Sequence, residues 1–134
     1  MHPMTDLDIH EICKQILALD KSIRFSVIGN KMGRIMASTS REDVKPLLTD
    51  EEVESSAIKS VLRMKTREDY EEKLGKPIYT FTLYEKVKRA SIPLTHENYA
   101  VLFISFDNYA PHEEIILSKI LPFLTKKKLV MFGH

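Results

Sequence analysis

The sequence predicts an α+β fold, a single three-layer domain in which helices cover both faces of a five-stranded antiparallel sheet. The first observation is the order of the elements, which is α-ββ-α-βββ-α along the chain. The second is that four strands form two hairpins with short turns, which pair antiparallel. The third is an almost unbroken apolar run over residues 99–106, typical of a central strand that is covered on both faces.

Length and charge limit the classes of protein to be considered. The chain has 134 residues, the usual size of one domain, so we assign residues 1–134 to one domain. Its 20 Lys and Arg against 19 Asp and Glu leave a net charge of +1, and nucleic acid is therefore not an expected partner. One cysteine, no signal-peptide pattern and no apolar run of membrane-spanning length together predict a cytoplasmic protein.

The first helix is expected to begin at Thr5 or Asp6, either of which can cap it, and to end near Asp20. Its apolar residues follow the three-and-four spacing of one helical face: Ile9, Ile12, Cys13, Ile16 and Leu17. Because Cys13 lies within this stripe, we interpret its thiol as a small core group and not as a nucleophile.

Residues 23–38 predict the first hairpin, because apolar and polar residues alternate in the first half. The turn GNKMGR over residues 29–34 contains Gly29, Asn30 and Gly33, which tolerate a positive φ, and the return strand covers residues 34–37. This turn lacks the Walker spacing and joins two strands, so turn geometry is favoured over phosphate binding.

The middle helix has the clearest start signal in the chain. Thr49 and Glu52 have the spacing of a capping box, and Leu48 can pack on Val53 as a hydrophobic staple. We interpret the carboxylates of residues 50–52 as partners of the helix dipole, since three successive helical residues do not converge on a metal.

The same helix is expected to continue to Leu74, with a bend near Thr66, because Gly75 and Pro77 follow. Its predicted buried stripe consists of Val53, Ala57, Ile58, Val61 and Leu62.

Two strands, residues 78–84 and 87–94, form the predicted second hairpin, with a tight turn at Glu85 and Lys86. Lys86, Lys88 and Arg89 lie near this turn and are candidate partner-binding residues, although they can also simply keep the tip soluble. Pro93 is expected at a strand end or facing a free edge.

The closing helix is expected to begin at Pro111 and to end or kink at Pro122. Three lysines, residues 126–128, suit its C-terminus. Residues 1–4 and 129–134 are expected to be flexible or docking tails.

The sequence contains no recognisable active site. His112 lies near Asp107, Glu113 and Glu114, but this group has neither metal-ligand spacing nor a partnered nucleophile, so we expect a helix-cap role. Neither a GxSxG nor an SxxK motif is present. We therefore predict no catalytic, metal or cofactor-binding residues, no cofactor, and a protein that is not an enzyme.

The chain resembles the roadblock/LC7 family and, more broadly, the profilin-like and longin-like folds. The resemblance covers residues 5–126 and is carried by the hairpin with its GNKMGR turn, the long middle helix and the strand 99–106. The extra segment 65–74 departs from the family pattern. The resemblance implies a non-enzymatic module that homodimerises and serves as a platform or regulator for small GTPases, motors or signalling proteins.

The residues give a separate reason to expect pairing. In the strand order of such folds the third strand lies at an edge, and residues 78–84 contain neither charge nor proline to block another chain. We predict that this strand pairs with its copy in a second subunit, beside the middle helix. The candidate dimer-interface residues are Ile78, Thr80, Thr82, Tyr84, Arg63 and Tyr70.

Two alternatives remain open. A PAS-like small-molecule sensor would use Tyr79, Phe81, Tyr84 and methionines to line a pocket, and a cavity of several hundred cubic ångströms with converging polar groups would favour it. A nucleic-acid partner contacting the lysines and the arginine of the second hairpin and residues 126–128 is the weakest alternative, because the net charge is near zero.

Overall fold

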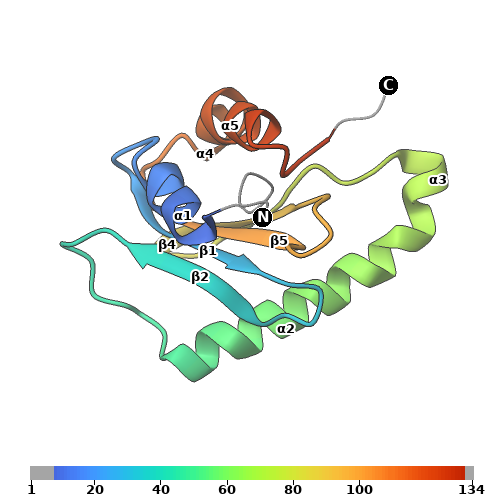
Figure 1. Cartoon of the computed structure of the whole chain (residues 1–134). Helices are drawn as coiled ribbons and strands as arrows, with labels where there is room; N and C mark the ends of the chain where they lie inside the picture. Colours follow the sequence, from blue (N-terminus) through green and yellow to red (C-terminus); the bar gives the residue numbers. More distant parts are fainter. Residues whose placement is uncertain (1–7, 132–134) are drawn as a thin grey trace, which may run out of the picture.

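A computed structural model describes residues 8–131 (Figure 1). The sheet has the strand order β2-β1-β5-β4-β3, and all neighbouring strands are antiparallel. The predicted fold class and element order are confirmed. The elements are α1 (Ile9–Leu17), β1 (Ile23–Gly29), β2 (Ile35–Ser40), α2 (Asp50–Arg67), the 3-10 turn η2 (Glu68–Tyr70), α3 (Glu71–Leu74), β3 (Thr80–Leu83), β4 (Val87–Pro93), β5 (Val101–Asp107), α4 (His112–Ile115), the π-helical η3 (Ile116–Ile120) and α5 (Leu121–Lys126).

Helices cover both faces of the sheet, as predicted. In Figure 1, α1 and the α4–α5 helix lie on one face and α2 runs along the other. The larger core cluster lies beneath α1 and α4–α5, and a smaller one, centred on Val27, Val61 and Phe103, lies beneath α2. The central strand is β5, whose residues 101–106 are all buried, as the apolar run predicted.

The first helix is shorter than predicted. It begins after Asp8, whose carboxylate accepts a hydrogen bond from the Glu11 amide (3.2 Å), and it ends at Leu17. The predicted caps Thr5 and Asp6 lie outside the described residues. Cys13 is fully buried, and burial raises the pKa of its thiol, which agrees with a core role.

In the first hairpin the return strand β2 extends to Ser40, beyond the predicted end. The side-chain oxygen of Asn30 accepts hydrogen bonds from the amides of Met32 (2.9 Å) and Arg34 (3.0 Å), which closes the turn. Gly33 has a φ of 84°, which confirms that turn geometry accounts for the glycine there.

The start of α2 is confirmed, and its buried stripe is partly wrong. Thr49 and Glu52 form both hydrogen bonds of the capping box. Ala57 and Val61 are buried, but Ile58 is 46% exposed and Leu62 is 57% exposed. The apolar contact surface of α2 is therefore narrower than its sequence predicts.

The helical segment from α2 to Leu74 is interrupted once, close to Thr66, where a bend was predicted. The interruption is the 3-10 turn η2, and the Thr66 hydroxyl donates to the Arg63 carbonyl (2.7 Å) just before it. Gly75 then ends the helical segment with a φ of 82°.

The third strand lies at the sheet edge, as predicted, but it is shorter. Regular pairing with β4 covers four residues, Thr80 to Leu83, instead of seven. Pro93 is the last residue of β4, which fits the expected strand end.

The closing helix continues through Pro122, which therefore does not end it. Proline has no N–H to donate, and just before it the Leu121 amide bonds to the Ile116 carbonyl, an i→i−5 bond that makes a π-helical turn. After this helix, Leu129 and Val130 pack back onto the domain and are buried. The Thr95 amide donates to the Leu129 carbonyl (2.8 Å). Residues 1–4 and 132–134 of the expected tails lie outside the described residues. Within residues 8–131 no helix has both the length and the apolar character needed to cross a membrane.

Candidate functional site

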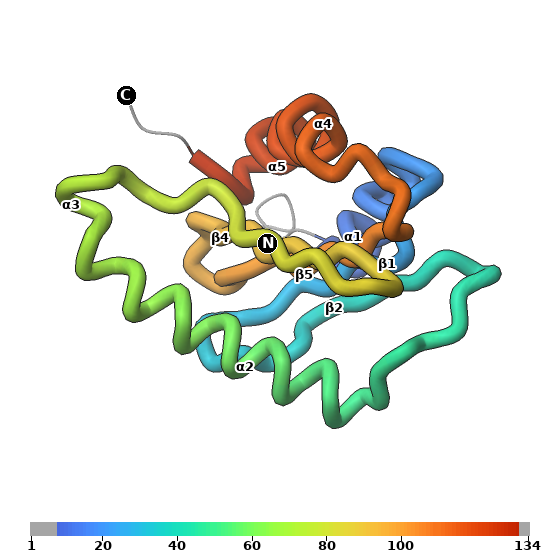
Figure 2. The backbone as a smooth tube through the Cα atoms, turned by 180° about the vertical axis from the view of Figure 1, so that it is seen from behind, coloured from blue at the N-terminus to red at the C-terminus, as the bar shows by residue number. Residues whose placement is uncertain are grey.

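The candidate site lies where the free edge of the sheet meets α2. Strand β3 pairs with β4 on one side, and within residues 8–131 no other strand pairs with it on the other side. Figure 2, seen from behind, shows α2 running along the sheet and the chain turning at α3. The chain then enters the hairpin formed by β3 and β4, which we call the edge hairpin. This arrangement leaves a pocket of about 470 Å³ between α2 and the hairpin.

Two regular patterns supply the pocket walls. From β3 and β4 come Thr80 and Thr82 with their cross-strand partners Ser91 and Arg89, which share one face of the sheet because paired residues do so. From α2 comes a stripe at spacings of four, three and four residues, which lies on one side of a helix. That stripe consists of Ser56, Ser60, Arg63 and Arg67.

The pocket is basic and rich in hydroxyl groups. Arg89 donates to the Ser56 hydroxyl (3.0 Å), and Arg63 donates to the Ser60 hydroxyl (3.1 Å). Among the described residues, no Asp or Glu lines the pocket, and the ion pairs involve Arg24, Arg41 and Lys119 but none of the three pocket arginines. The guanidinium groups therefore face the pocket without a carboxylate partner.

The six predicted dimer-interface residues do not all lie together. Arg63, Thr80, Thr82 and Tyr84 line this pocket. Ile78 precedes β3 and is 47% exposed beside Leu117, Leu121 and Pro122 of the closing helix, where it forms an apolar surface. Tyr70 is 62% exposed in η2 and does not line the pocket.

The three predicted partner-binding residues point in different directions. Lys86 is exposed in the turn between β3 and β4. Lys88 donates to the Ala110 carbonyl (2.7 Å), next to the start of α4, whereas Arg89 donates to Ser56 on α2. Because successive strand residues point to opposite faces, Lys88 and Arg89 serve different surfaces.

His112 does not have the predicted cap role. Residue Pro111 occupies the N-cap position of α4, without a side-chain hydrogen bond. The imidazole of His112 instead stacks on the Phe81 ring, with 3.7 Å between centroids. Burial and the nearby Lys88 cation lower the pKa of His112, and its buried Nδ1 has no hydrogen-bond partner among the described residues.

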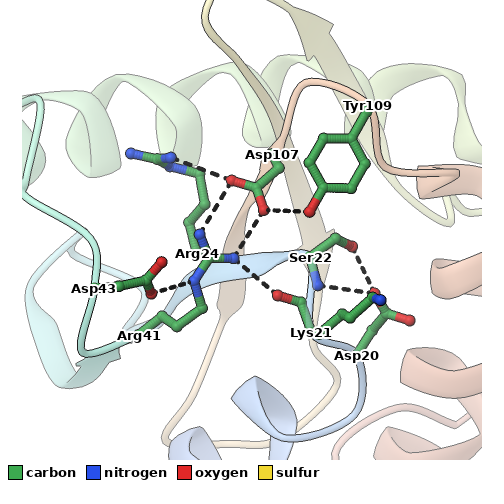
Figure 3. Close-up of polar contacts among 8 residues, drawn as sticks. All are labelled: Asp20, Lys21, Ser22, Arg24, Arg41, Asp43, Asp107 and Tyr109. Carbon is green, nitrogen blue, oxygen red and sulfur yellow. Dashed lines mark hydrogen bonds and ion pairs between the residues drawn. The ribbon is translucent and has the colours of Figure 1, made fainter.

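Asp107, the acid expected near that histidine, is engaged elsewhere (Figure 3). Its carboxylate accepts from Arg41 (2.8 and 3.2 Å), Arg24 (3.3 Å) and the Tyr109 hydroxyl (3.1 Å). The hydrogen bonds from Arg41, together with those from Tyr109 and Arg24, lower the pKa of Asp107 despite burial. Arg41 also donates to Asp43 (2.6 Å), so this network ties the loop before α2 to strands β1 and β5.

Part of the site was missed in the sequence. Of the stripe formed by Ser56, Ser60, Arg63 and Arg67, only Arg63 is among the predicted interface residues, although the same helical spacing identifies the other three. Among residues 8–131, no three His, Cys, Asp or Glu side chains gather to form a metal site.

Solved structures similar to this one share its architecture. Myxococcus xanthus MglB is 14% identical, with a TM-score of 0.69 over 92% of this chain and 94% of that one. A structure of MglB with a tetrameric arrangement is also 14% identical, with a TM-score of 0.68 over 90% and 85% of the two chains. A roadblock/LC7 domain from Streptomyces avermitilis is 7% identical, with a TM-score of 0.65 over 92% and 96%. The chain has a roadblock/LC7 fold. At these identities the likeness concerns the fold alone, and no protein-family model or curated protein sequence matches the chain.

Within this roadblock/LC7 fold, the free β3 edge, the polar stripe of α2 and the pocket between them are adjacent. One continuous surface therefore offers unpaired backbone groups, guanidinium groups and hydroxyl groups.

Proposed function

We propose that the protein is a homodimeric interaction and regulatory module that acts without catalysis. The observation that carries this proposal is the β3 edge, because residues 78–84 have no charge or proline to prevent another strand from pairing there. Two copies related by a two-fold axis would join their sheets through β3.

The hydrogen-bonding pattern defines which groups a second copy would meet. The Tyr84 amide donates to the Val87 carbonyl (2.9 Å) in the turn of the edge hairpin. Because inward and outward amides alternate along an antiparallel strand, the amides of Phe81 and Leu83 point away from β4. Leu83 is 65% exposed, so its side chain is also accessible.

The charge distribution of α2 favours an antiparallel approach of two helices. The N-terminal half carries the acidic residues Asp50, Glu51, Glu52 and Glu54. The C-terminal half carries the basic residues Lys59, Arg63, Lys65 and Arg67. Two such helices attract each other when they run in opposite directions and repel each other in parallel.

We further propose that the dimer serves as a cytoplasmic platform for a small GTPase or another signalling protein. This step is supported by the roadblock/LC7 fold, and a similar structure, that of MglB, has a tetrameric arrangement. Lys86, Lys88 and Arg89 remain candidate contacts for such a partner.

The dimer is tested by Leu83→Pro with Leu83→Thr as the matched control. Proline removes an outward amide while the inward bonds of β3 to β4 remain, whereas threonine removes only the apolar side chain. Light scattering coupled to gel filtration should show dimers for the parent and Leu83→Thr, and a folded monomer for Leu83→Pro. A parent protein that is monomeric at about 100 μM, well above the micromolar range of modest interfaces, would contradict the proposal.

The partner is tested by capture from the native cell with tagged parent protein and tagged Leu83→Pro. The expected result is a GTP-binding protein retained by the parent and lost with the monomeric variant. Capture without enrichment of any GTP-binding or signalling protein argues against a platform.

A PAS-like sensor of small molecules is the second candidate, and the pocket of about 470 Å³ with converging polar groups is the observation that favours it. Phe81 and Tyr84 line it as expected for that candidate, whereas Tyr79 does not. Native mass spectrometry separates the two candidates, because a copurified small molecule supports the sensor and a ligand-free dimer supports the platform.

A further inference from the structure

The pocket between α2 and the edge hairpin has an unusual composition for the inner surface of a sheet. The apolar residues of α2, Ala57 and Val61, pack against Val27, Val101 and Phe103 of β1 and β5. This contact places α2 over the middle of the sheet. The β3–β4 hairpin is therefore left without an apolar cover on this face, and its side chains there are threonine, serine and arginine.

Three guanidinium groups are brought together there by different elements. Arg63 and Arg67 lie four residues apart on α2, and Arg89 lies across from them on β4. In the part of the chain that the structure describes, none of them has a carboxylate within ion-pair distance. Like charges in a partly enclosed space repel each other, so an anion between them is favoured.

The hydroxyl groups specify the kind of anion. Five of them line the same pocket, on Ser56, Ser60, Thr80, Thr82 and Ser91. Guanidinium groups donate two parallel hydrogen bonds to an oxyanion, and hydroxyl groups can donate to its remaining oxygens. Ser56 and Ser60 also hold Arg89 and Arg63 through neutral acceptors, which orients both guanidinium groups without neutralising them.

We propose that this pocket binds a small molecule that carries a phosphate group, held by Arg63, Arg67 and Arg89. Phosphate fits better than the side chains of a flat protein partner because the donors surround a concave volume of about 470 Å³, larger than a single phosphate ion. Tyr84, Met64 and Phe103 line the same pocket and provide apolar contacts for the rest of the molecule. All the lining residues come from one subunit, but Arg63, Thr80, Thr82 and Tyr84 are also dimer-interface candidates, so the proposal requires that pairing through β3 leaves the pocket open.

The experiment uses inorganic phosphate and pyrophosphate as probes, with chloride at the same ionic strength as the reference. Calorimetry and thermal unfolding should show binding of pyrophosphate to the parent, with phosphate weaker. Arg67→Gln should weaken pyrophosphate binding about tenfold, because a charge-assisted contact is lost. The Arg67 side chain makes no hydrogen bond within the described residues, so this variant should fold normally.

Arg89→Gln should weaken binding at least as much as Arg67→Gln. Lys86→Gln is the matched control, since it removes one positive charge near the same hairpin but outside the pocket. An equal loss in Lys86→Gln would show general electrostatic attraction and would overturn the proposal. Absence of pyrophosphate binding to the parent would also overturn it.

The monomeric Leu83→Pro variant separates this inference from the proposed dimer. Binding of pyrophosphate to both the parent and Leu83→Pro supports a site within one subunit, whatever the oligomeric state proves to be. Binding to Leu83→Pro alone would mean that a second copy occupies the pocket in the parent, and the ligand proposal would then be wrong.

Discussion

Gly33, in the turn between β1 and β2, lies directly against Ile58 of α2. A Cβ atom at position 33 would lie 2.8 Å from both the Cα and the Cγ1 atoms of Ile58, closer than two carbon atoms can pack. The contact joins α2 to the turn between β1 and β2, which lie on the opposite side of β5 from β3 and β4 in the sheet. The helix that lines the phosphate pocket is therefore positioned in part by a glycine far from that pocket in sequence.

We predict that Gly33→Ala destabilises the protein by about 2 kcal/mol or more. About 1 kcal/mol comes from placing alanine at a φ of 84°, and the rest comes from displacing Ile58. Gly75→Ala serves as a comparison for backbone strain alone, because nothing lies within 4 Å of its Cβ position, while its φ of 82° and ψ of 173° are almost exclusive to glycine. A loss for Gly33→Ala of only about 1 kcal/mol in urea unfolding, the cost of the positive φ alone, would show that the contact with Ile58 contributes nothing.

The topology could be predicted because helix capping and the apolar pattern of the sequence both indicate the same order of helices and strands. The capping box at Thr49 and Glu52 predicts the start of α2, and the apolar run 99–106 predicts the central strand, which the structure has at Val101–Asp107. The edge position of β3 was implied by the strand order of the folds that the chain resembles, and its uncharged residues are compatible with that position. Its seven uncharged residues overstated its length, because composition shows what a strand tolerates and not where pairing begins.

The pocket could not be predicted in the same way, because it depends on where α2 sits on the sheet. Ile58 and Leu62 fit the apolar stripe in sequence but lie outside the buried contact, which Ala57 and Val61 make. The smaller contact leaves room beside α2. The pairing of Thr82 with Arg89 is likewise a matter of register, which the sequence of neither strand specifies alone.

The cap of α2 gives a second prediction. Thr49→Ala removes the hydroxyl that accepts a hydrogen bond from the Glu52 amide (3.1 Å), and it should destabilise the protein by about 1 kcal/mol. Thr66→Ala is the control, because its hydroxyl donates to a carbonyl within the same helix and caps nothing. Circular dichroism during urea unfolding measures both variants, and a smaller loss for Thr49→Ala than for Thr66→Ala contradicts the cap's importance.

The network around Asp107 leads to a prediction about pH. The bonds from Arg41 lower the pKa of Asp107 below its unfolded value near 3.8, so the carboxylate stabilises the folded state fully above that value. This contribution is lost as the pH falls below 3.8 and through the folded pKa. Stability therefore decreases in acid, and the decrease should depend on the residue at position 107.

Asp107→Asn is expected to destabilise the protein by about 1–2 kcal/mol at pH 7, because the half-buried Arg24 loses its charged acceptor and Arg41 keeps only the exposed Asp43. The difference between parent and variant should shrink as the pH falls below 3.8, because the unfolded parent chain then takes up a proton at Asp107 while the folded carboxylate, with its lower pKa, is still ionised. Asp43→Asn, which changes an exposed partner of Arg41, should have little effect on the free energy of unfolding at any of the three pH values measured. Urea unfolding at pH 7, 5 and 3 measures all three proteins. A difference that stays constant down to pH 3 would mean that the charge of Asp107 does not stabilise the fold, and that its hydrogen bonds could be made equally well by a neutral amide.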